Sequence, residues 1–319
     1  MKRKLMALAG GAALAISALA PATAGAAGTA GAAGVAKPPK PTVRAGTTAA
    51  CEMPLGSVDA SGAHVSTGIT ANTPPTATNP FKTTGVYAPG AVRLSSRFSS
   101  VPNIAGADEY GTVVIGDSLY WSSYAIDGTG QIDPTFPHSL TRIGGGWTPF
   151  TFLEVSGFST LNDPGRTTAY ALRNDGVLYR WNVGKTWSST GSYPGFSAVK
   201  TMALIAKTKT YDTFLATTKG GALYTIHIPT TSPMKPVVKQ VRSRTWQGFE
   251  ALVASRCGQY GTLLLGIDKD TKTSYLYAVG HANGAATVIN GLGAVPGTRA
   301  DNVYFPWVPI DFYDELYGE

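Results

Sequence analysis

The stretch from Tyr170 to Trp181 reads YALRNDGVLYRW and decides the fold class. Two β-prone runs, Tyr170–Leu172 and Val177–Trp181, flank the tripeptide Asn174-Asp175-Gly176. Residues of these types tolerate a positive φ in a tight turn, so the stretch predicts a β-hairpin.

The Leu-Tyr pair inside this hairpin recurs along the chain, which predicts one supersecondary unit used several times. The five copies are Leu119-Tyr120, Leu178-Tyr179, Leu223-Tyr224, Leu276-Tyr277 and Leu316-Tyr317.

An aromatic landmark precedes three of the five Leu-Tyr pairs at a nearly constant distance, which is stronger evidence for a repeat than the Leu-Tyr pairs alone. The landmarks are Trp147-Thr148-Pro149-Phe150, Tyr193-Pro194-Gly195-Phe196 and Trp246-Gln247-Gly248-Phe249. The spacing to the next Leu-Tyr leucine is 28 residues from 150 to 178, 27 from 196 to 223, 27 from 249 to 276, and again 27 from Val92 to 119.

Repeated antiparallel units with aromatic punctuation and Gly-rich turns are typical of a β-propeller. Five Leu-Tyr landmarks predict five blades, with four or six as alternatives. Because the fifth landmark is followed by only two residues, Gly318 and Glu319, we expect an N-terminal strand, drawn from Glu52 to Thr70 and centred on Gly62 to Ile69, to close the ring. Closure also removes an exposed strand edge, which is an aggregation hazard.

The N-terminus has the features of a secretory signal peptide over residues 1–24. Basic residues are followed by an apolar run and by Ala22-Thr23-Ala24, a pattern that suits signal peptidase. The run is shorter than the roughly 20 apolar residues that span a bilayer. Residues 25–50 are rich in Ala, Gly and Pro and predict a disordered leader, and residues 51–319 predict a single propeller domain. We therefore expect a secreted, extracellular protein without a membrane anchor, and a monomer.

Composition narrows the classes of partner and predicts little helix. Removal of Lys2, Arg3 and Lys4 changes the formal charge from +7 to +4, and the remaining basic residues are dispersed, which argues against nucleic acid. Charged residues make up only 14% of the chain, as in many secreted β proteins.

The two cysteines, Cys51 and Cys257, predict one disulfide in a chain addressed to an oxidising compartment. The alternative is two separately buried thiols. Neither cysteine has a nearby histidine, so a catalytic thiol is not expected.

The stretch Ile143–Phe150, followed by Tyr170–Tyr179, resembles the repeat of tachylectin-2-like propellers, with a Gly-Gly-Trp segment before an Asp-Gly-x-Leu-Tyr hairpin. This resemblance implies a five-bladed propeller that binds N-acetylated amino sugars between neighbouring blades. The sequence departs from the pattern in the third hairpin, which has Lys219-Gly220-Gly221, and in the fourth, which has the insertion Asp268 to Thr273.

A sugar site needs an aromatic face for the apolar side of the ring and a few directed polar groups. The alternative is structural, because repeated tryptophans in a propeller pack between blades and Asn-Asp-Gly is a turn. The candidate ligand-binding residues are Trp147, Arg173, Asn174, Asp175, Trp187 and Trp246.

Signals for catalysis or for a metal are few, and we expect neither a cofactor nor a metal ion. The segment Asp127–Asp133 alternates oxygen-bearing residues as a calcium loop does, but position twelve is His138 rather than Glu. A glycosidase needs only two well-placed carboxylates, and pairing among the aspartates cannot be judged from their spacing. The aspartates considered are Asp117, Asp163, Asp175 and Asp212.

The sequence therefore predicts a secreted, non-catalytic, lectin-like propeller that binds a glycan or cell-wall polysaccharide. The alternatives are a polysaccharide-acting hydrolase or lyase that uses the axial face of the propeller, and a cell-envelope scaffold that binds proteins.

Overall fold

The computed structural model describes residues 50–160, 162–308 and 315–319, which belong to one compact unit, Ala49–Glu319. The predicted signal peptide and, apart from Ala50, the predicted leader lie outside the described residues. Regular structure in the described part consists of 21 β-strands, β1 to β21. It includes no helix with the length and hydropathy needed to cross a membrane.

Three antiparallel sheets of four strands each follow one another along the second half of the chain. The first contains β9 (Phe150–Thr160), β10 (Asp163–Arg173), β11 (Leu178–Asn182) and β12 (Ser188–Tyr193). The second contains β13 (Val199–Lys207), β14 (Tyr211–Thr218), β15 (Leu223–Pro229) and β16 (Val237–Arg242). The third contains β17 (Ala251–Cys257), β18 (Gly261–Asp268), β19 (Thr273–Val279) and β20 (Ile289–Ala294).

A nine-stranded sheet joins the beginning of the compact unit to its end. One arm consists of β5 (Val92–Pro102), β6 (Ala107–Ile115), β7 (Ser118–Ile126) and β8 (Ser139–Gly145). The other consists of β21 (Val303–Val308), β1 (Glu52–Val58), β2 (His64–Thr70), β3 (Thr76–Ala77) and β4 (Phe81–Thr83).

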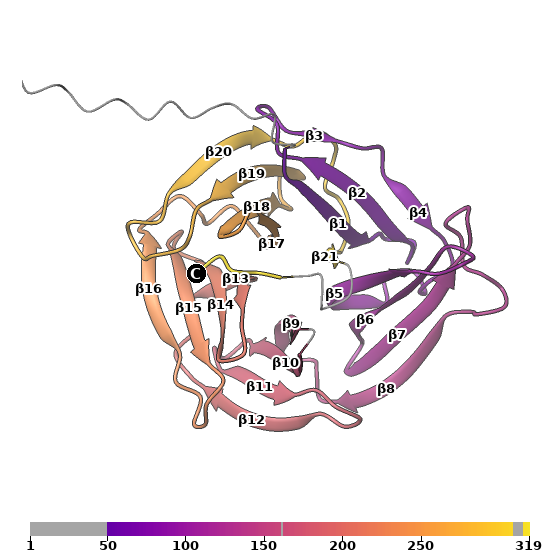
Figure 1. Cartoon of the computed structure of the whole chain (residues 1–319), viewed down its shortest axis with the longest axis horizontal. Helices are drawn as coiled ribbons and strands as arrows, with labels where there is room; N and C mark the ends of the chain where they lie inside the picture. The colour runs from indigo at the N-terminus through magenta and orange to yellow at the C-terminus, as the bar shows by residue number, and fades with distance from the viewer. Residues whose placement is uncertain (1–49, 161, 309–314) are drawn as a thin grey trace, which may run out of the picture. The chain divides into compact units, whose positions relative to one another are not determined.

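Strand β21 closes the ring by pairing on both of its edges. It pairs antiparallel with β1, from Leu55 opposite Pro306 to Val58 opposite Val303, and parallel with β5, where Trp307 lies opposite Phe98. Figure 1 shows the resulting ring, with β9, β13, β17 and β21 toward the centre and β12, β16 and β20 at the rim. The β-propeller prediction is confirmed.

The role of the N-terminal segment in closure is larger than predicted. The predicted strand Gly62 to Ile69 corresponds to β2, but the segment also supplies β1, β3 and β4. Within the described residues, the later part of the chain contributes the inner strand β21 to this arm, and β1 and β2 form the part outside it. The number of five blades stays a prediction, since two of the five groups of strands form one continuous sheet.

The Leu-Tyr landmarks mark the third strand of a four-stranded group in four of their five copies. The leucines at 119, 178 and 223 lie at or near the start of β7, β11 and β15, Leu276 lies in the middle of β19, and all four are buried. The fifth copy is different, because Tyr317 forms an isolated bridge with Ala206 rather than starting a hairpin. That landmark therefore does not mark a blade.

The opening hairpin shows why its turn needs glycine. Arg173 and Val177 close the turn through an N–H to C=O hydrogen bond of 3.0 Å, and Gly176 has φ +83°. A Cβ at Gly176 would lie 2.2 Å from the Ser197 nitrogen, so both the φ value and the close backbone exclude a side chain.

The apolar core of the described residues divides into five clusters, each formed by two neighbouring groups of strands. Tyr170 of β10 packs edge-on against Phe214 of β14, with ring centroids 5.2 Å apart. Asp212 crosses the same interface as a polar link, because its two oxygens accept from Arg166 at 2.7 and 2.8 Å and the Tyr170 hydroxyl donates to it at 2.7 Å. Each sheet therefore depends on its two neighbours for burial.

The predicted disulfide between Cys51 and Cys257 is confirmed. Cys257 ends β17, and Cys51 precedes β1, so the bond attaches the N-terminal closing segment to the sheet of β17 to β20. The bridged residues are 206 positions apart.

Replacement of both cysteines by serine should lower the free energy of unfolding by roughly 5 kcal/mol, because the unfolded chain then regains the entropy of a long loop. Chemical denaturation under non-reducing conditions measures this change. A reducing agent should destabilise the wild-type protein and leave the double variant unchanged. Equal stability of the two proteins without reductant would contradict the role assigned to the bond.

Candidate active site

The N-terminal ends of the inner strands converge on a cavity of about 110 Å³. Its lining includes residues from the first part of five inner strands, namely Ser95 of β5, Leu153 of β9, Met202 of β13, Leu252 of β17 and Tyr304 of β21. We call this cavity the axial pocket. Two acidic residues, Glu154 and Glu250, belong to its lining.

Glu250 is held in place at both carboxylate oxygens. It directly precedes β17, and its Oε1 forms an ion pair with the Lys200 ammonium group of β13. Its Oε2 accepts from the backbone N–H of Lys269 at 2.7 Å. Glu250 therefore bridges two neighbouring sheets and has little freedom to rotate.

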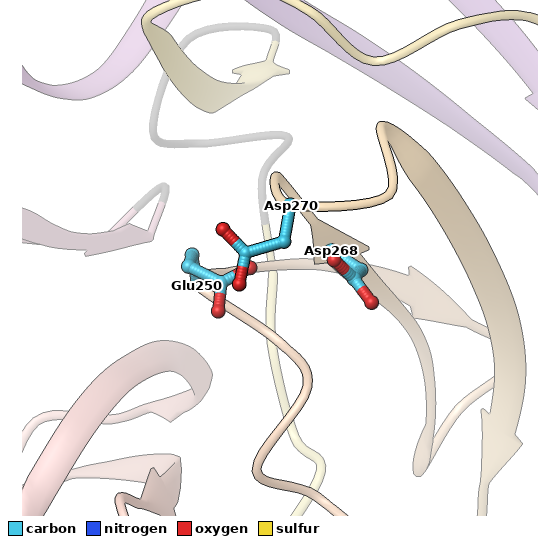
Figure 2. Close-up of side chains that lie close together, drawn as sticks. All are labelled: Glu250, Asp268 and Asp270. Carbon is cyan, nitrogen blue, oxygen red and sulfur yellow. The ribbon is translucent and has the colours of Figure 1, made fainter.

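Asp268 and Asp270 lie beside Glu250 because β17 and β18 form a hairpin that returns the chain to the same end of the sheet. Asp268 is the last residue of β18, and Asp270 lies in the turn that follows. One carboxylate oxygen from each of the three residues lies within 4.8 Å of the others. Figure 2 shows Glu250 and Asp270 facing each other, with Asp268 beside them.

Lys269, between the two aspartates in sequence, lines the axial pocket as well. Its ammonium group donates to the Asn302 carbonyl at 2.7 Å and lies 5.9 Å from the centre of the Tyr304 ring. Burial lowers the pKa of Lys269, although the Glu250 carboxylate acts to raise it. The backbone N–H and the side chain of Lys269 thus fix the carboxylate cluster to the pocket wall.

This arrangement can perform acid–base chemistry or bind a cation. Paired carboxylates at short separation are the working groups of glycosidases. Carboxylate oxygens are also the ligands that divalent cations such as Ca²⁺ prefer. Asp268 already accepts from the Thr271 N–H at 2.9 Å, and the side chain of Asp270 is exposed. Asp270 is therefore the most accessible of the three carboxylates.

Sequence reasoning missed this cluster, since it treated Asp268 to Thr273 only as an insertion in the fourth hairpin. The aspartates that it named do not meet. Asp117 accepts from Gly146 and Thr148, Asp163 pairs with Lys209, Asp175 with Arg173, and Asp212 with Arg166.

The predicted ligand residues Arg173, Asn174 and Asp175 lie together at the exposed turn between β10 and β11. Arg173 and Asp175 form an ion pair there, and the Arg173 Nη1 donates to the Tyr179 hydroxyl at 3.0 Å. None of the three residues lines the axial pocket. Whether they bind a ligand stays a prediction.

The predicted aromatic platforms lie in two separate clusters. Trp147 is 6% exposed and packs against Phe150 with ring centroids 4.7 Å apart, and Trp187 lies 6.3 Å from it. Trp246 is 5% exposed and packs on Tyr277 in the cluster between the sheets of β13–β16 and β17–β20. The low exposure of Trp147 and Trp246 favours packing between sheets over an open sugar platform.

In the calcium-like loop Asp127–Asp133, the first carboxylate already accepts hydrogen bonds from other residues of the loop. The Oδ1 of Asp127 accepts from the Thr129 N–H, the Thr129 hydroxyl and the Gln131 N–H, at 2.8, 2.6 and 3.2 Å. These bonds explain the alternating pattern as loop structure. Among the described residues, the group that could hold a metal ion is instead Glu250, Asp268 and Asp270.

No protein-family model matches the chain, and no curated protein sequence matches it. Solved structures with a similar fold include the catalytic domain of a GH62 α-L-arabinofuranosidase from Coprinopsis cinerea. That match has 15% sequence identity and a TM-score of 0.42, and it covers 67% of this chain and 73% of that chain. A GH43_1 enzyme from Xanthomonas citri matches at 11% identity, 64% and 75% coverage and a TM-score of 0.38. The BP39L lectin from Burkholderia pseudomallei matches at 17% identity, 77% and 66% coverage and a TM-score of 0.39.

These comparisons contradict the prediction of a non-catalytic, lectin-like protein, because GH62 and GH43 enzymes stand among the similar structures. They support the propeller fold rather than tachylectin-2-like propellers in particular. The prediction depended on Trp147 and Trp246, which are buried, whereas two of the three clustered carboxylates, Asp268 and Asp270, lie in the insertion of the fourth hairpin. The likeness concerns the fold alone, and the chemistry of this chain depends on its own residues.

Replacement of Trp147 by alanine should destabilise the protein by about 3 to 5 kcal/mol, since it empties a large buried volume between two sheets. Thermal or chemical denaturation measures the change. Arg173→Ala at the exposed turn is the matched control, and it should leave the free energy of unfolding nearly unchanged, because exposed ion pairs contribute little to stability. A Trp147→Ala variant as stable as the control would show that this side chain is not part of the core.

Proposed function

We propose that the chain hydrolyses glycosidic bonds of a polysaccharide at the axial pocket, with Glu250 and Asp270 as the reacting pair. One observation carries this proposal. The carboxylates of Glu250, Asp268 and Asp270 have oxygens within 4.8 Å of one another, and Glu250 lines a pocket on the propeller axis.

The hydrogen bonds suggest different roles for the two reacting groups. Glu250 accepts from Lys200 at one oxygen and from the Lys269 N–H at the other, so it is oriented as an acceptor and suits the nucleophile. Asp270 is exposed, and no described residue donates a hydrogen bond to its carboxylate, so it can exchange a proton with substrate and water. Asp268 supplies a fixed negative charge beside the positive charge that develops on the sugar ring.

These roles give a balanced two-step reaction. Glu250 attacks the anomeric carbon while Asp270, in its acid form, donates a proton to the leaving oxygen as the glycosidic bond breaks. Water then attacks the same carbon, Asp270 takes the proton from that water, and the bond to Glu250 breaks. Both residues return to their starting states.

A polysaccharide substrate agrees with the predicted extracellular localisation. A secretory signal peptide would bring the chain to the compartment in which a disulfide persists and in which extracellular polysaccharides are found. The finer expectation of N-acetylated amino sugars derives from the resemblance to tachylectin-2-like propellers. Chitin therefore belongs beside arabinoxylan, xylan and cellulose in the substrate panel.

Glu250→Gln and Asp270→Asn should each lower kcat by about 10² to 10⁴ while leaving the fold intact, because each change removes one of the two reacting groups. Release of reducing ends from the four polysaccharides measures the effect. Glu52→Gln, which removes an exposed carboxylate in β1, should retain wild-type activity.

Three results would count against the proposal. Hydrolysis by the Glu250→Gln variant at the wild-type rate would exclude this site, and the absence of any released sugar from wild-type protein on all four substrates would exclude the activity on them. Activity that is lost with a chelator and restored by Ca²⁺ would assign the carboxylates to a metal rather than to proton transfer.

The stereochemistry of the product should be retained. A carboxyl separation of about 5 Å is typical of retaining glycosidases, whereas inverting enzymes need about 6.5 to 9.5 Å to admit a water molecule between the groups. Proton NMR of the first anomer released identifies the outcome. Inversion would mean that Glu250 and Asp270 are not nucleophile and acid.

A further inference from the structure

A second cavity lies at the other end of the inner strands, between β21 and β5. Its volume is about 480 Å³, which falls within the range of small-molecule pockets in proteins. Ser100 and Pro102 come from the last part of β5, Trp307 from the last part of β21, and Phe81 from β4. This cavity, which we call the β5–β21 cavity, shares no lining residue with the carboxylate cluster at the axial pocket.

Glu109 of β6 is an acidic group buried in the wall of the β5–β21 cavity, with 2% of its surface exposed. Its Oε1 accepts from the Ser100 hydroxyl, and its Oε2 accepts from the Trp307 indole N–H, both at 2.7 Å. A carboxylate offers about four acceptor positions. Two positions therefore remain for a ligand.

Apart from Ser66, the rest of the described lining is apolar or already hydrogen-bonded. The Thr83 hydroxyl donates to the Gly130 carbonyl at 2.8 Å, and the Ser100 hydroxyl donates to the Glu109 carboxylate. Phe81 is 46% exposed and, with Trp307, provides aromatic surface. Among the described residues that line the cavity, none is a lysine, an arginine or a histidine.

This chemistry fits an amine better than a sugar. A sugar ring needs several directed donors and acceptors, whereas here two of the three lining hydroxyl groups are engaged, which leaves Ser66. A single anionic group beside aromatic side chains suits an ammonium group, which also gains from a tryptophan or phenylalanine face.

We propose that the β5–β21 cavity binds a small organic amine, whose ammonium group pairs with the Glu109 carboxylate and whose apolar body lies against Trp307 and Phe81.

The environment of Glu109 makes this binding depend on pH. Burial raises the pKa of Glu109 to about 7, and the hydrogen bonds from Ser100 and Trp307 act against the rise. The carboxylate that pairs with an ammonium group therefore predominates above pH 7 and is lost as the pH falls below it.

Other ionisable groups lie on β6, on its neighbour β7, and on β2 and β4, which contribute lining residues to the cavity. Asp108 of β6 raises the pKa of Glu109 through its charge. Burial raises the pKa of Tyr124 in β7 well above its usual value and lowers the pKa of His64 in β2 to about 3. Lys82 of β4 is paired with Asp59, which raises its pKa. The protonation states of Tyr124, His64 and Lys82 therefore stay the same between pH 6 and pH 8.

Calorimetric titration of the whole chain with 2-phenylethylamine, compared with 2-phenylethanol, tests this inference. An alkyl amine with a pKa of about 10 stays protonated at pH 6 and at pH 8. The amine should bind about tenfold more tightly at pH 8 than at pH 6, following the ionised fraction of Glu109. The neutral alcohol should bind at least about tenfold more weakly than the amine at pH 8.

Glu109→Gln should remove most of the amine affinity and its pH dependence. Asp108→Asn removes a neighbouring carboxylate that does not line the cavity and should bind the amine at pH 8 as the wild type does. At pH 6 this control should bind no more weakly than the wild type, because the Asp108 charge raises the pKa of Glu109. If the Glu109→Gln variant does not fold, the pH dependence of amine binding to the wild-type protein still tests the inference. Absence of amine binding, equal affinity for amine and alcohol, equal affinity at the two pH values, or wild-type affinity in folded Glu109→Gln would each overturn the inference.

Discussion

The pairing of β21 with β1 on one edge and β5 on the other is the constraint on which the rest of the structure depends. Each group of strands buries its apolar faces only against its two neighbours, as the five core clusters show. An open ring would expose the edges of β1 and β5 and leave two of these faces in water. The N-terminal segment and β21 meet across some 250 residues of chain, and the disulfide from Cys51 to Cys257 holds the same region.

Closure also creates the candidate active site. The inner strands begin at one end of the ring, so their first residues surround a common axis and form the axial pocket. The β17–β18 hairpin brings Asp270 beside Glu250, which lines that pocket, and Lys200 of β13 fixes Glu250 from the neighbouring sheet. The disulfide attaches β17 at its opposite end, at Cys257. The reacting groups thus stand on a hairpin that is held at both ends, which favours a fixed geometry.

The repeat and the disulfide could be predicted from the sequence because they leave periodic or compositional signals. The spacing of 27 or 28 residues identifies the third strand at Leu178 and its equivalents, where burial demands a large apolar residue. The pair Leu316-Tyr317 was wrongly predicted to mark a blade, because a Leu-Tyr pair alone does not show which strand its residues pair with. Glu250 and Asp270 could not be found, since only hairpin geometry joins them and charged residues near turns are common in solvent. The burial of Glu109 in the wall of the β5–β21 cavity likewise depends on Trp307, which is distant in sequence.

The central claim is that the axial pocket, rather than the aromatic surface near Trp147 and Trp187, receives the sugar whose bond is broken. A crystal structure of the Glu250→Gln variant with a bound xylo-, cello- or chito-oligosaccharide tests it most directly. The account predicts a sugar ring in the axial pocket, with a glycosidic oxygen about 3 Å from an Asp270 carboxylate oxygen. An oligosaccharide bound only between sheets, away from Glu250 and Asp270, would contradict it.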